Sequence, residues 1–182
     1  MSSRRKFLKT GATAALAGSA ISCTGNKSGW ECLTDEEAAT VEAICGQLIP
    51  ADQDPGAAWA GVVRFIDRQL AGFYKRHRQA YRDGLAAVNR TAMLLDGAPF
   101  AALPSAKQAD ILSAMEKRKA PPEAWGQQSA RDFFDLILAH TMQGFYGSPR
   151  HGGNRDAVSW HMLGVSVFPV RGRAHFHARA KG

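Results

Sequence analysis

The sequence lacks the motifs that mark most enzyme active sites and cofactor sites. It has no Gly-x-Ser-x-Gly of a serine hydrolase, no Gly-x-Gly-x-x-Gly after a predicted strand and no Cys-x-x-Cys-His for covalent haem. Its six histidines include no His-Glu-x-x-His pair, which would place two zinc ligands on one helix face. We therefore predict no catalytic residue, no bound cofactor and no metal in this chain.

A hydrophobic run long enough to span a bilayer is also missing. The weakly apolar segment over residues 10–21 has about 12 residues, whereas a membrane-spanning helix needs about 20. The preceding residues Arg4-Arg5, with Phe7 and Leu8, and the absence of acidic residues are typical of a twin-arginine signal. We predict a removable signal over residues 1–22, recognised by the twin-arginine translocase, and a periplasmic location close to the cytoplasmic membrane.

Cysteine is scarce, with three in the chain. Small residues precede Cys23 and polar ones follow it, so cleavage either leaves Cys23 as a lipidated N-terminal residue or falls elsewhere. Residues 23–33 are expected to form a flexible linker. Cys45 lies about three turns into the predicted helix that follows Cys32, too far for a disulfide between them. We expect a buried Cys45 thiol, and a Cys32 that is free or paired with another chain.

The positive charge belongs largely to the signal. Arg4, Arg5, Lys6 and Lys9 supply four of the net charge of +7, and no acidic residue precedes Cys23, so the rest carries +3. This balance excludes nucleic acid as the expected partner. A basic patch over residues 75–82 is read as a solvated face, with docking of an acidic partner as the alternative.

Helical periodicity dominates the remaining sequence. The capping box Thr34-x-x-Glu37 begins a helix that ends before Pro50, and Ser105 with Gln108 is expected to cap a later one. Residues 165–170 are the only strand-like piece. We predict a mostly α, single compact domain of about five helices over residues 34–170, followed by a basic tail over residues 171–182. The expected apolar stripes and helical segments run through residues 38–48, 62–73 (with Phe73 on the stripe), 81–95, 111–115 and 131–142, the last ending at Gly144.

The densest unusual stretch combines glycines with adjacent aromatics and predicts an ordered loop. A phosphate-binding loop would follow a strand and end in Lys-Ser/Thr, whereas this one follows a helix. One of Phe145 and Tyr146 is expected to face outward. The histidines near the loop are read as surface residues, with a metal site formed by His140, His151 and His161 as the alternative. The loop residues singled out are Gly144, Phe145, Tyr146, Gly147, Pro149, Gly152, Gly153 and Asn154, with Trp160 beyond them.

This loop carries a resemblance to a known family. The run Thr141-x-x-Gly144-Phe145-Tyr146-Gly147-x-Pro149-x-x-Gly152-Gly153-Asn154, with Trp160 and Gly164 beyond, resembles the signature of the gluconate 2-dehydrogenase subunit 3 family. The segments 33–52 and 100–112 are similar to its N-terminal and middle blocks. His151 stands where the family often has tyrosine, and residues 165–182 match less well.

The resemblance implies a small subunit of a membrane-associated, flavin-dependent sugar or alcohol dehydrogenase. FAD would be held by a large catalytic subunit and haem c by a cytochrome c subunit. The small subunit would support maturation of the catalytic subunit and carry it through the twin-arginine translocase. The loop residues would form the docking surface or its frame. The alternatives are a lipid-anchored envelope protein without a redox partner and, less favoured, a stand-alone periplasmic metalloenzyme using the loop histidines.

Overall fold

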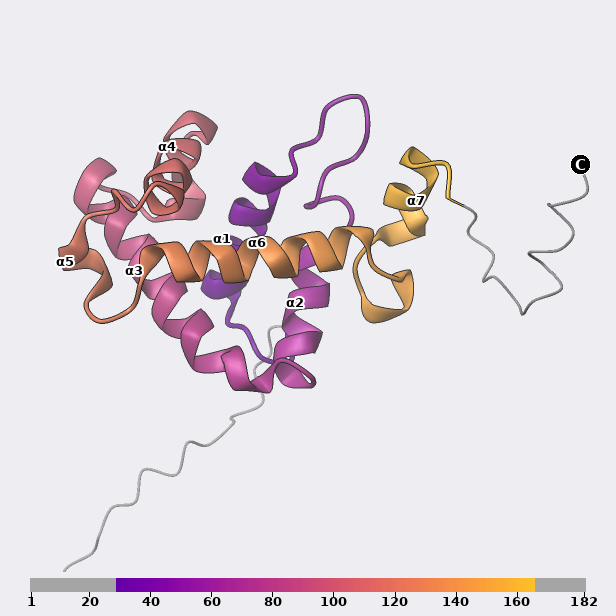
Figure 1. The fold of residues 1–182 in the computed structure, drawn as a ribbon, viewed down its shortest axis with the longest axis horizontal. Coiled ribbons are helices and arrows are strands. Elements are labelled where there is room, and N and C mark those ends of the chain that lie inside the picture. Colours follow the sequence, from indigo (N-terminus) through magenta and orange to yellow (C-terminus); the bar gives the residue numbers. More distant parts are fainter. Residues whose placement is uncertain (1–28, 166–182) are drawn as a thin grey trace, which may run out of the picture.

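The computed structural model describes residues 29–165, which fold into α-helices and short 3-10 helices (Figure 1). The predicted export-signal residues Arg4, Arg5, Phe7 and Leu8, the predicted lipidation site Cys23 and the tail over residues 171–182 lie outside the described residues. The elements are α1 (Asp35–Leu48), α2 (Val62–Ala71), η1 (Lys75–His77), α3 (Arg78–Asp96), η2 (Phe100–Ala102), α4 (Ser105–Glu116), α5 (Pro122–Trp125), α6 (Ala130–Tyr146), η3 (Pro149–His151), η4 (Arg155–Ala157) and α7 (Val158–Met162).

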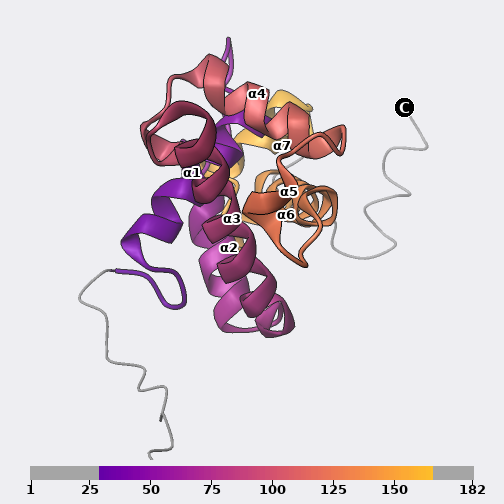
Figure 2. The same cartoon turned by 90° about the vertical axis from the view of Figure 1, so that its left-hand side faces the viewer.

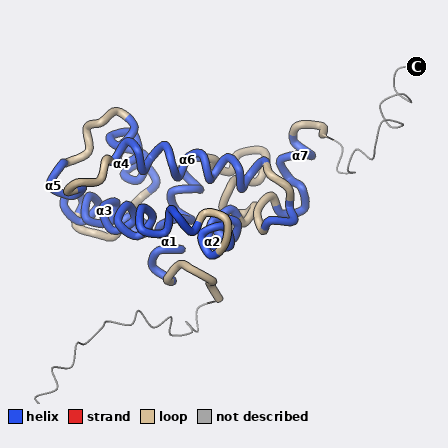
Figure 3. The backbone as a smooth tube through the Cα atoms, turned by 60° about the horizontal axis from the view of Figure 1, so that its bottom comes forward, coloured by secondary structure: helices blue, strands red, loops and turns tan. Residues whose placement is uncertain are grey.

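The mostly α prediction is confirmed, and the described part of the chain contains no strand (Figure 3). Of the strand-like segment 165–170, only Val165 is described, and it is not in a strand. The structure has seven α-helices rather than about five. The two unexpected ones, α5 with 4 residues and α7 with 5, are too short to show a helical period in the sequence.

The first helix begins as the sequence predicts. The Thr34 hydroxyl accepts a hydrogen bond from the Glu37 amide at 3.1 Å, and the Thr34 amide donates to the Glu37 carboxylate at 2.8 Å. This capping box satisfies two amides that the first helical turn leaves without partners. Val41 and Ile44 then place their side chains fully in the core.

The hydrophobic core lies between α6 and the helices that it crosses. Figure 1 shows α6 as a long helix running across the molecule, and the view turned by 90° shows it beside α5 (Figure 2). It packs on α2 and α4, while α1 contacts α2, α4 and η2. The largest fully buried side chains include Tyr81, Phe100, Phe133, Phe145, Ile66 and Leu70.

Two expectations about helix ends and faces are wrong. Ser105 does not cap α4. Pro104 occupies the N-cap of this helix, and the Ser105 hydroxyl instead accepts a hydrogen bond from the side-chain amide of Gln47 at 2.9 Å. The α2 helix ends at Ala71, so Phe73 lies beyond the apolar stripe and is 75% exposed. Gly72 ends the helix before Phe73 can reach the core-facing side.

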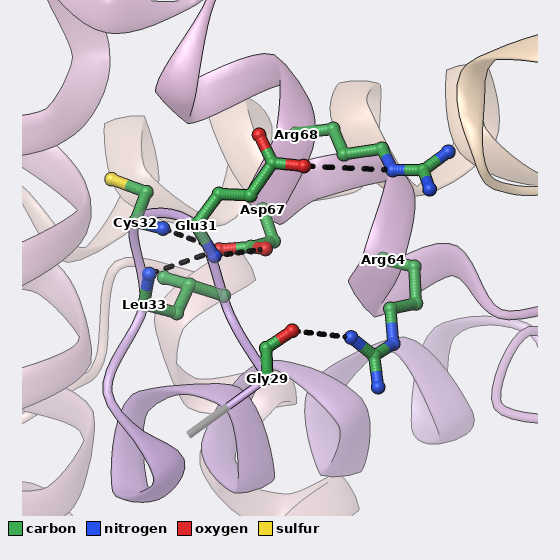
Figure 4. A network of polar contacts seen from close by, with 7 residues as sticks. All are labelled: Gly29, Glu31, Cys32, Leu33, Arg64, Asp67 and Arg68. Atoms are coloured by element: carbon green, nitrogen blue, oxygen red, sulfur yellow. Dashed lines mark hydrogen bonds and ion pairs between the residues drawn. The ribbon is translucent and has the colours of Figure 1, made fainter. Parts of the chain in front are cut away.

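Residues 29–33, expected as the end of a flexible linker, are instead held against α2, and we call them the N-terminal strap. The buried Asp67 carboxylate accepts hydrogen bonds from three successive backbone amides, at 2.8 to 3.0 Å (Figure 4). The Arg64 guanidinium donates to the Gly29 carbonyl at 2.7 Å and lies 4.1 Å from the Trp30 ring. A buried carboxylate needs such donors, so the strap and α2 stabilise each other.

None of the helices in residues 29–165 combines the length and the hydropathy needed to cross a bilayer.

Candidate functional site: the glycine-rich loop between α6 and α7

The α6 helix continues through the first part of the expected loop, as far as Tyr146. The expectation that Gly144 ends this helix is therefore wrong. A Cβ on Gly144 would stand 2.8 Å from Cδ1 of Phe65 and 3.0 Å from Cγ1 of Val62. A mid-helix glycine costs about 1 kcal/mol relative to alanine, and here it allows α2 and α6 to approach closely.

The two adjacent aromatics point in different directions. Phe145 is fully buried, whereas Tyr146 is 39% exposed, which confirms that one of the pair faces outward. Their ring centroids lie 5.0 Å apart with the ring planes perpendicular. The buried Phe145 ring therefore supports the Tyr146 ring from one side, in the edge-to-face geometry that aromatic pairs favour.

After the helix, the loop folds back onto the end of α6. A Cβ on Gly153 would stand 2.2 Å from the Gly144 carbonyl oxygen, so the two backbones are in direct contact. Gly152 has φ of 103°, in the region that glycine tolerates. A Cβ there would also stand 3.1 Å from Cδ of Arg68, which places the loop against α2.

Asn154 closes the loop from within. Its side chain is fully buried, its amide nitrogen donates to the Gly147 carbonyl at 2.8 Å, and its amide oxygen accepts from the Ser159 backbone amide at 3.0 Å. Its backbone is left-handed, with φ of 48°, a conformation that asparagine tolerates better than most residues. One side chain thus joins the end of α6 to α7.

A second tie joins α7 to α6 at the surface. The Trp160 indole, which is half-buried, donates to the Tyr146 carbonyl at 2.9 Å. On the far side of the loop, the Arg155 amide donates to the Ala60 carbonyl at 3.0 Å and its guanidinium lies 5.4 Å from the Trp59 ring. The loop is therefore fixed to α6, α7 and the segment before α2.

The structure brings all the loop residues chosen from the sequence together, but it divides their roles. Phe145, Gly153 and Asn154 are buried and shape the loop, so a partner cannot reach them. Tyr146 is exposed, and Pro149 and Trp160 are half-buried, so these three reach the surface.

The histidines near the loop do not gather at one place. His151 and His161 are exposed, but His140 is buried, so reading it as a surface residue is wrong. Within residues 29–165, no three side chains of His, Cys, Asp or Glu lie close enough together to hold a metal ion. The described residues therefore offer no ligand set for the alternative metal site at His140, His151 and His161.

His140 belongs to a polar cluster between α6 and the residues around the start of α3. Its Nδ1 lies 2.9 Å from the Tyr81 hydroxyl, and its ring stacks on Tyr74 with the centroids 4.1 Å apart. The Tyr74 hydroxyl donates to the Gln143 side chain. Burial, with the positive charges of His77 and Arg76, lowers the pKa of His140 to about 4. The imidazole is therefore neutral at pH 7 and has a hydrogen-bond partner.

The two described cysteines are both free. Cys45 is buried, as expected, with its sulfur 3.2 Å from the Thr141 hydroxyl, and burial raises its pKa to about 12. Such a thiol stays protonated and unreactive at neutral pH.

Comparison with known proteins identifies the family to which the chain belongs. The family model for gluconate 2-dehydrogenase subunit 3 matches residues 35–166, from the first residue of α1 past the end of α7. The chain belongs to the gluconate 2-dehydrogenase subunit 3 family. This family is one of subunits of gluconate 2-dehydrogenase-like complexes. No curated protein and no solved structure matches the chain.

Sequence reasoning missed exposed apolar side chains on the two helices that flank the loop, α6 and α7. Met142 is 42% exposed and lies one helical turn before Tyr146, and Met162 and Leu163 at the end of α7 are 42% and 62% exposed. The spacing of Met142 and Tyr146 at i and i+4 was the available signal. It was hidden because the loop was expected to begin before Tyr146.

Proposed function

We propose that this chain is a non-catalytic accessory subunit of an FAD-dependent dehydrogenase that oxidises CH–OH groups. The observation that carries the proposal is membership of the subunit 3 family over residues 35–166. In this proposal FAD resides in the catalytic subunit and haem c in a cytochrome c subunit. The role of the present chain is to support maturation of the catalytic subunit and to accompany it to the periplasm.

The proposed export role rests on the residues before the domain. Arg4, Arg5, Phe7 and Leu8 form a twin-arginine pattern, which addresses folded cargo to its translocase. A catalytic subunit that binds FAD in the cytoplasm would then be exported in complex with this chain. Lipid on Cys23, together with the complex itself, would hold the assembly at the cytoplasmic membrane.

The proposed docking surface is the exposed end of the loop, where Tyr146 and Trp160 meet the end of α7. Aromatic and long apolar side chains dominate the binding energy of protein interfaces. The buried bonds of Asn154 hold these groups in place before a partner arrives, so little conformational entropy is lost on binding. The end of α6 and the end of α7, which flank the loop, carry four exposed apolar side chains: Met142, Tyr146, Met162 and Leu163.

Export is tested by replacing Arg4→Lys and Arg5→Lys together in cells that express the whole complex. The expected result is that the catalytic flavoprotein stays in the cytoplasm with its FAD bound. The matched control, Lys6→Arg with Lys9→Arg, keeps the charge and leaves the arginine pair intact, so export continues. A flavoprotein that reaches the periplasm in the double-lysine strain would contradict co-export.

Docking is tested with Met162→Glu and Leu163→Glu introduced together. Charges at the centre of an apolar interface are unfavourable, so co-purification of the catalytic subunit should fall by at least about tenfold. The control pair, Met93→Glu with Leu94→Glu, changes two side chains of similar exposure on α3. Loss of the complex in the control pair alone would place the docking surface on α3 instead.

A further inference from the structure

Phe73 is the most exposed large apolar side chain among residues 29–165, at 75%. It lies between α2 and η1, at a corner that we call the basic corner and define as residues 72–82. A single exposed apolar residue is common on soluble surfaces, so Phe73 is of interest because a run of basic residues lies in the same corner.

Positive charge is concentrated in the sequence after Phe73. Lys75 and Arg76 follow two and three residues later, and Arg78 and Arg82 continue the run, all with exposed side chains. None of these four forms an ion pair with another described residue. The nearest acidic residue in sequence, Asp83, accepts a hydrogen bond from Gln79. The corner therefore combines one exposed apolar ring with four exposed cations that form no ion pair among the described residues, although Arg76 and Arg78 make hydrogen bonds to His77 and to the end of α2.

The corner is rigid. The Arg78 guanidinium donates to the Leu70 and Ala71 carbonyls at 2.7 and 2.8 Å, and so closes the C-terminus of α2. Tyr74 is buried, stacks on His140 and lies 5.6 Å from the Phe73 ring. Because Tyr74 is anchored inward, the neighbouring Phe73 is held outward, and little freedom remains to be lost on binding.

The N-terminal strap lies beside the same corner. It is bonded along α2 through Arg64 and Asp67 (Figure 4). The Cys32 amide donates to Asp67, which lies five residues before the corner begins at Gly72. The described chain therefore begins beside α2, the helix whose C-terminus leads into the corner.

We propose that the basic corner is a membrane-contact site that binds anionic phospholipid headgroups, with Phe73 entering the headgroup region and Lys75 and Arg76 pairing with phosphates. Clustered basic residues beside an aromatic ring are the combination that anionic bilayer surfaces attract. One ring and a few cations give weak, reversible binding, so the site works as the second of two membrane signals. The proposal needs no dehydrogenase partner and stands apart from the proposed function.

The test measures partitioning of the exported chain onto vesicles of phosphatidylglycerol and phosphatidylcholine, with pure phosphatidylcholine for comparison. All samples carry Cys23→Ser, so that lipid on this residue cannot contribute. Lys75→Glu with Arg76→Glu should lower partitioning onto the anionic vesicles about 20-fold or more, and Phe73→Ser about tenfold. Binding to neutral vesicles should be weak for every variant.

Matched controls separate the corner from general charge and hydrophobicity. Lys117→Glu with Lys119→Glu makes the same charge change at the exposed end of α4, and Leu94→Ser removes another exposed apolar side chain. Both should stay within about twofold of the unchanged chain. Equal losses in the corner and control pairs would overturn the proposal. The proposal would also be overturned if the corner variants kept their lipid binding but no longer co-purified with the catalytic subunit. The corner would then be a protein-docking surface.

Discussion

The backbone of Gly153 lies directly against the Gly144 carbonyl, with room for no side-chain atom between them. This contact between a loop and the last turn of α6 sets the shape of the whole glycine-rich loop. It makes the loop sensitive to the addition of one methyl group.

We predict that Gly153→Ala lowers the free energy of unfolding by about 2 kcal/mol or more, because a Cβ at 2.2 Å forces two backbones apart. Urea denaturation followed by circular dichroism measures the change. The control is Gly46→Ala in α1, where a Cβ meets nothing within 4 Å. There alanine should raise stability by about 0.5 to 1 kcal/mol, and an equal loss at both positions would contradict the role of the contact.

Asn154→Ala should lower the free energy of unfolding by about 2 kcal/mol, because it leaves the buried Ser159 amide and the half-buried Gly147 carbonyl without partners. Hydrogen exchange should show faster exchange of the Ser159 amide with little change in α3. Asp156→Gly is the control, since Asp156 is exposed and left-handed with φ of 52°, and stability should change by less than about 1 kcal/mol. Normal protection of Ser159 in the alanine variant would refute the assigned role.

Stability should fall as the pH drops through the titration range of His140. Its pKa is about 4 in the folded protein, below the ordinary value of 6.5. The unfolded chain therefore binds the proton first, so the stabilisation is complete above about pH 6.5 and is lost progressively toward pH 4. Burial and Arg76 also lower the pKa of His77, which adds to the same trend.

The measurement is the urea midpoint at several pH values between 4 and 7. His140→Phe should flatten the dependence over this window, at a lower stability overall because the Tyr81 hydroxyl loses its partner. The exposed His161→Phe is the matched control and should keep the slope of the unchanged protein. Identical slopes for all three proteins would show that His140 does not cause the pH dependence of stability.

Asp67→Asn should release the N-terminal strap. The carboxylate accepts from Glu31 through one oxygen and from Cys32 and Leu33 through the other, whereas an asparagine side chain offers a single acceptor oxygen. The expected loss is about 2 kcal/mol, with faster hydrogen exchange at these amides. Glu31→Gln breaks only the exposed pair with Arg68 and should cost less than about 1 kcal/mol. Unchanged protection of these amides in Asp67→Asn would refute the role of the Asp67 carboxylate in holding the strap.

Local signals in the sequence predicted the helices well. The capping box of α1 and the apolar period of α6 depend on residues three or four positions apart, and the structure confirms both. The function of Gly144 depends on Phe65, which is distant in sequence. A glycine that ends a helix and one that admits a neighbouring helix look the same in one sequence, so the end of α6 was placed too early.

Contacts over long sequence distances account for the other errors. Asp67 bonds amides 34 to 36 residues away, and no local pattern distinguishes this buried carboxylate from a solvated one. His140 is buried because Tyr74 and Tyr81 enclose it, and neither tyrosine lies on its own helix. The glycine-aromatic run was recognisable as a site, but the division into buried frame and exposed surface required the fold.

The bonds that Arg64 and Asp67 make to the N-terminal strap also bear on how mechanical force would enter the molecule. A pull applied to the chain ahead of Gly29 would be carried by Arg64 and Asp67 into the middle of α2. Because α2 packs on α6, such a load would pass into the core before it reached the first turn of α1. The contacts of Arg64 and Asp67 would thus shield α1 from tension on the preceding chain.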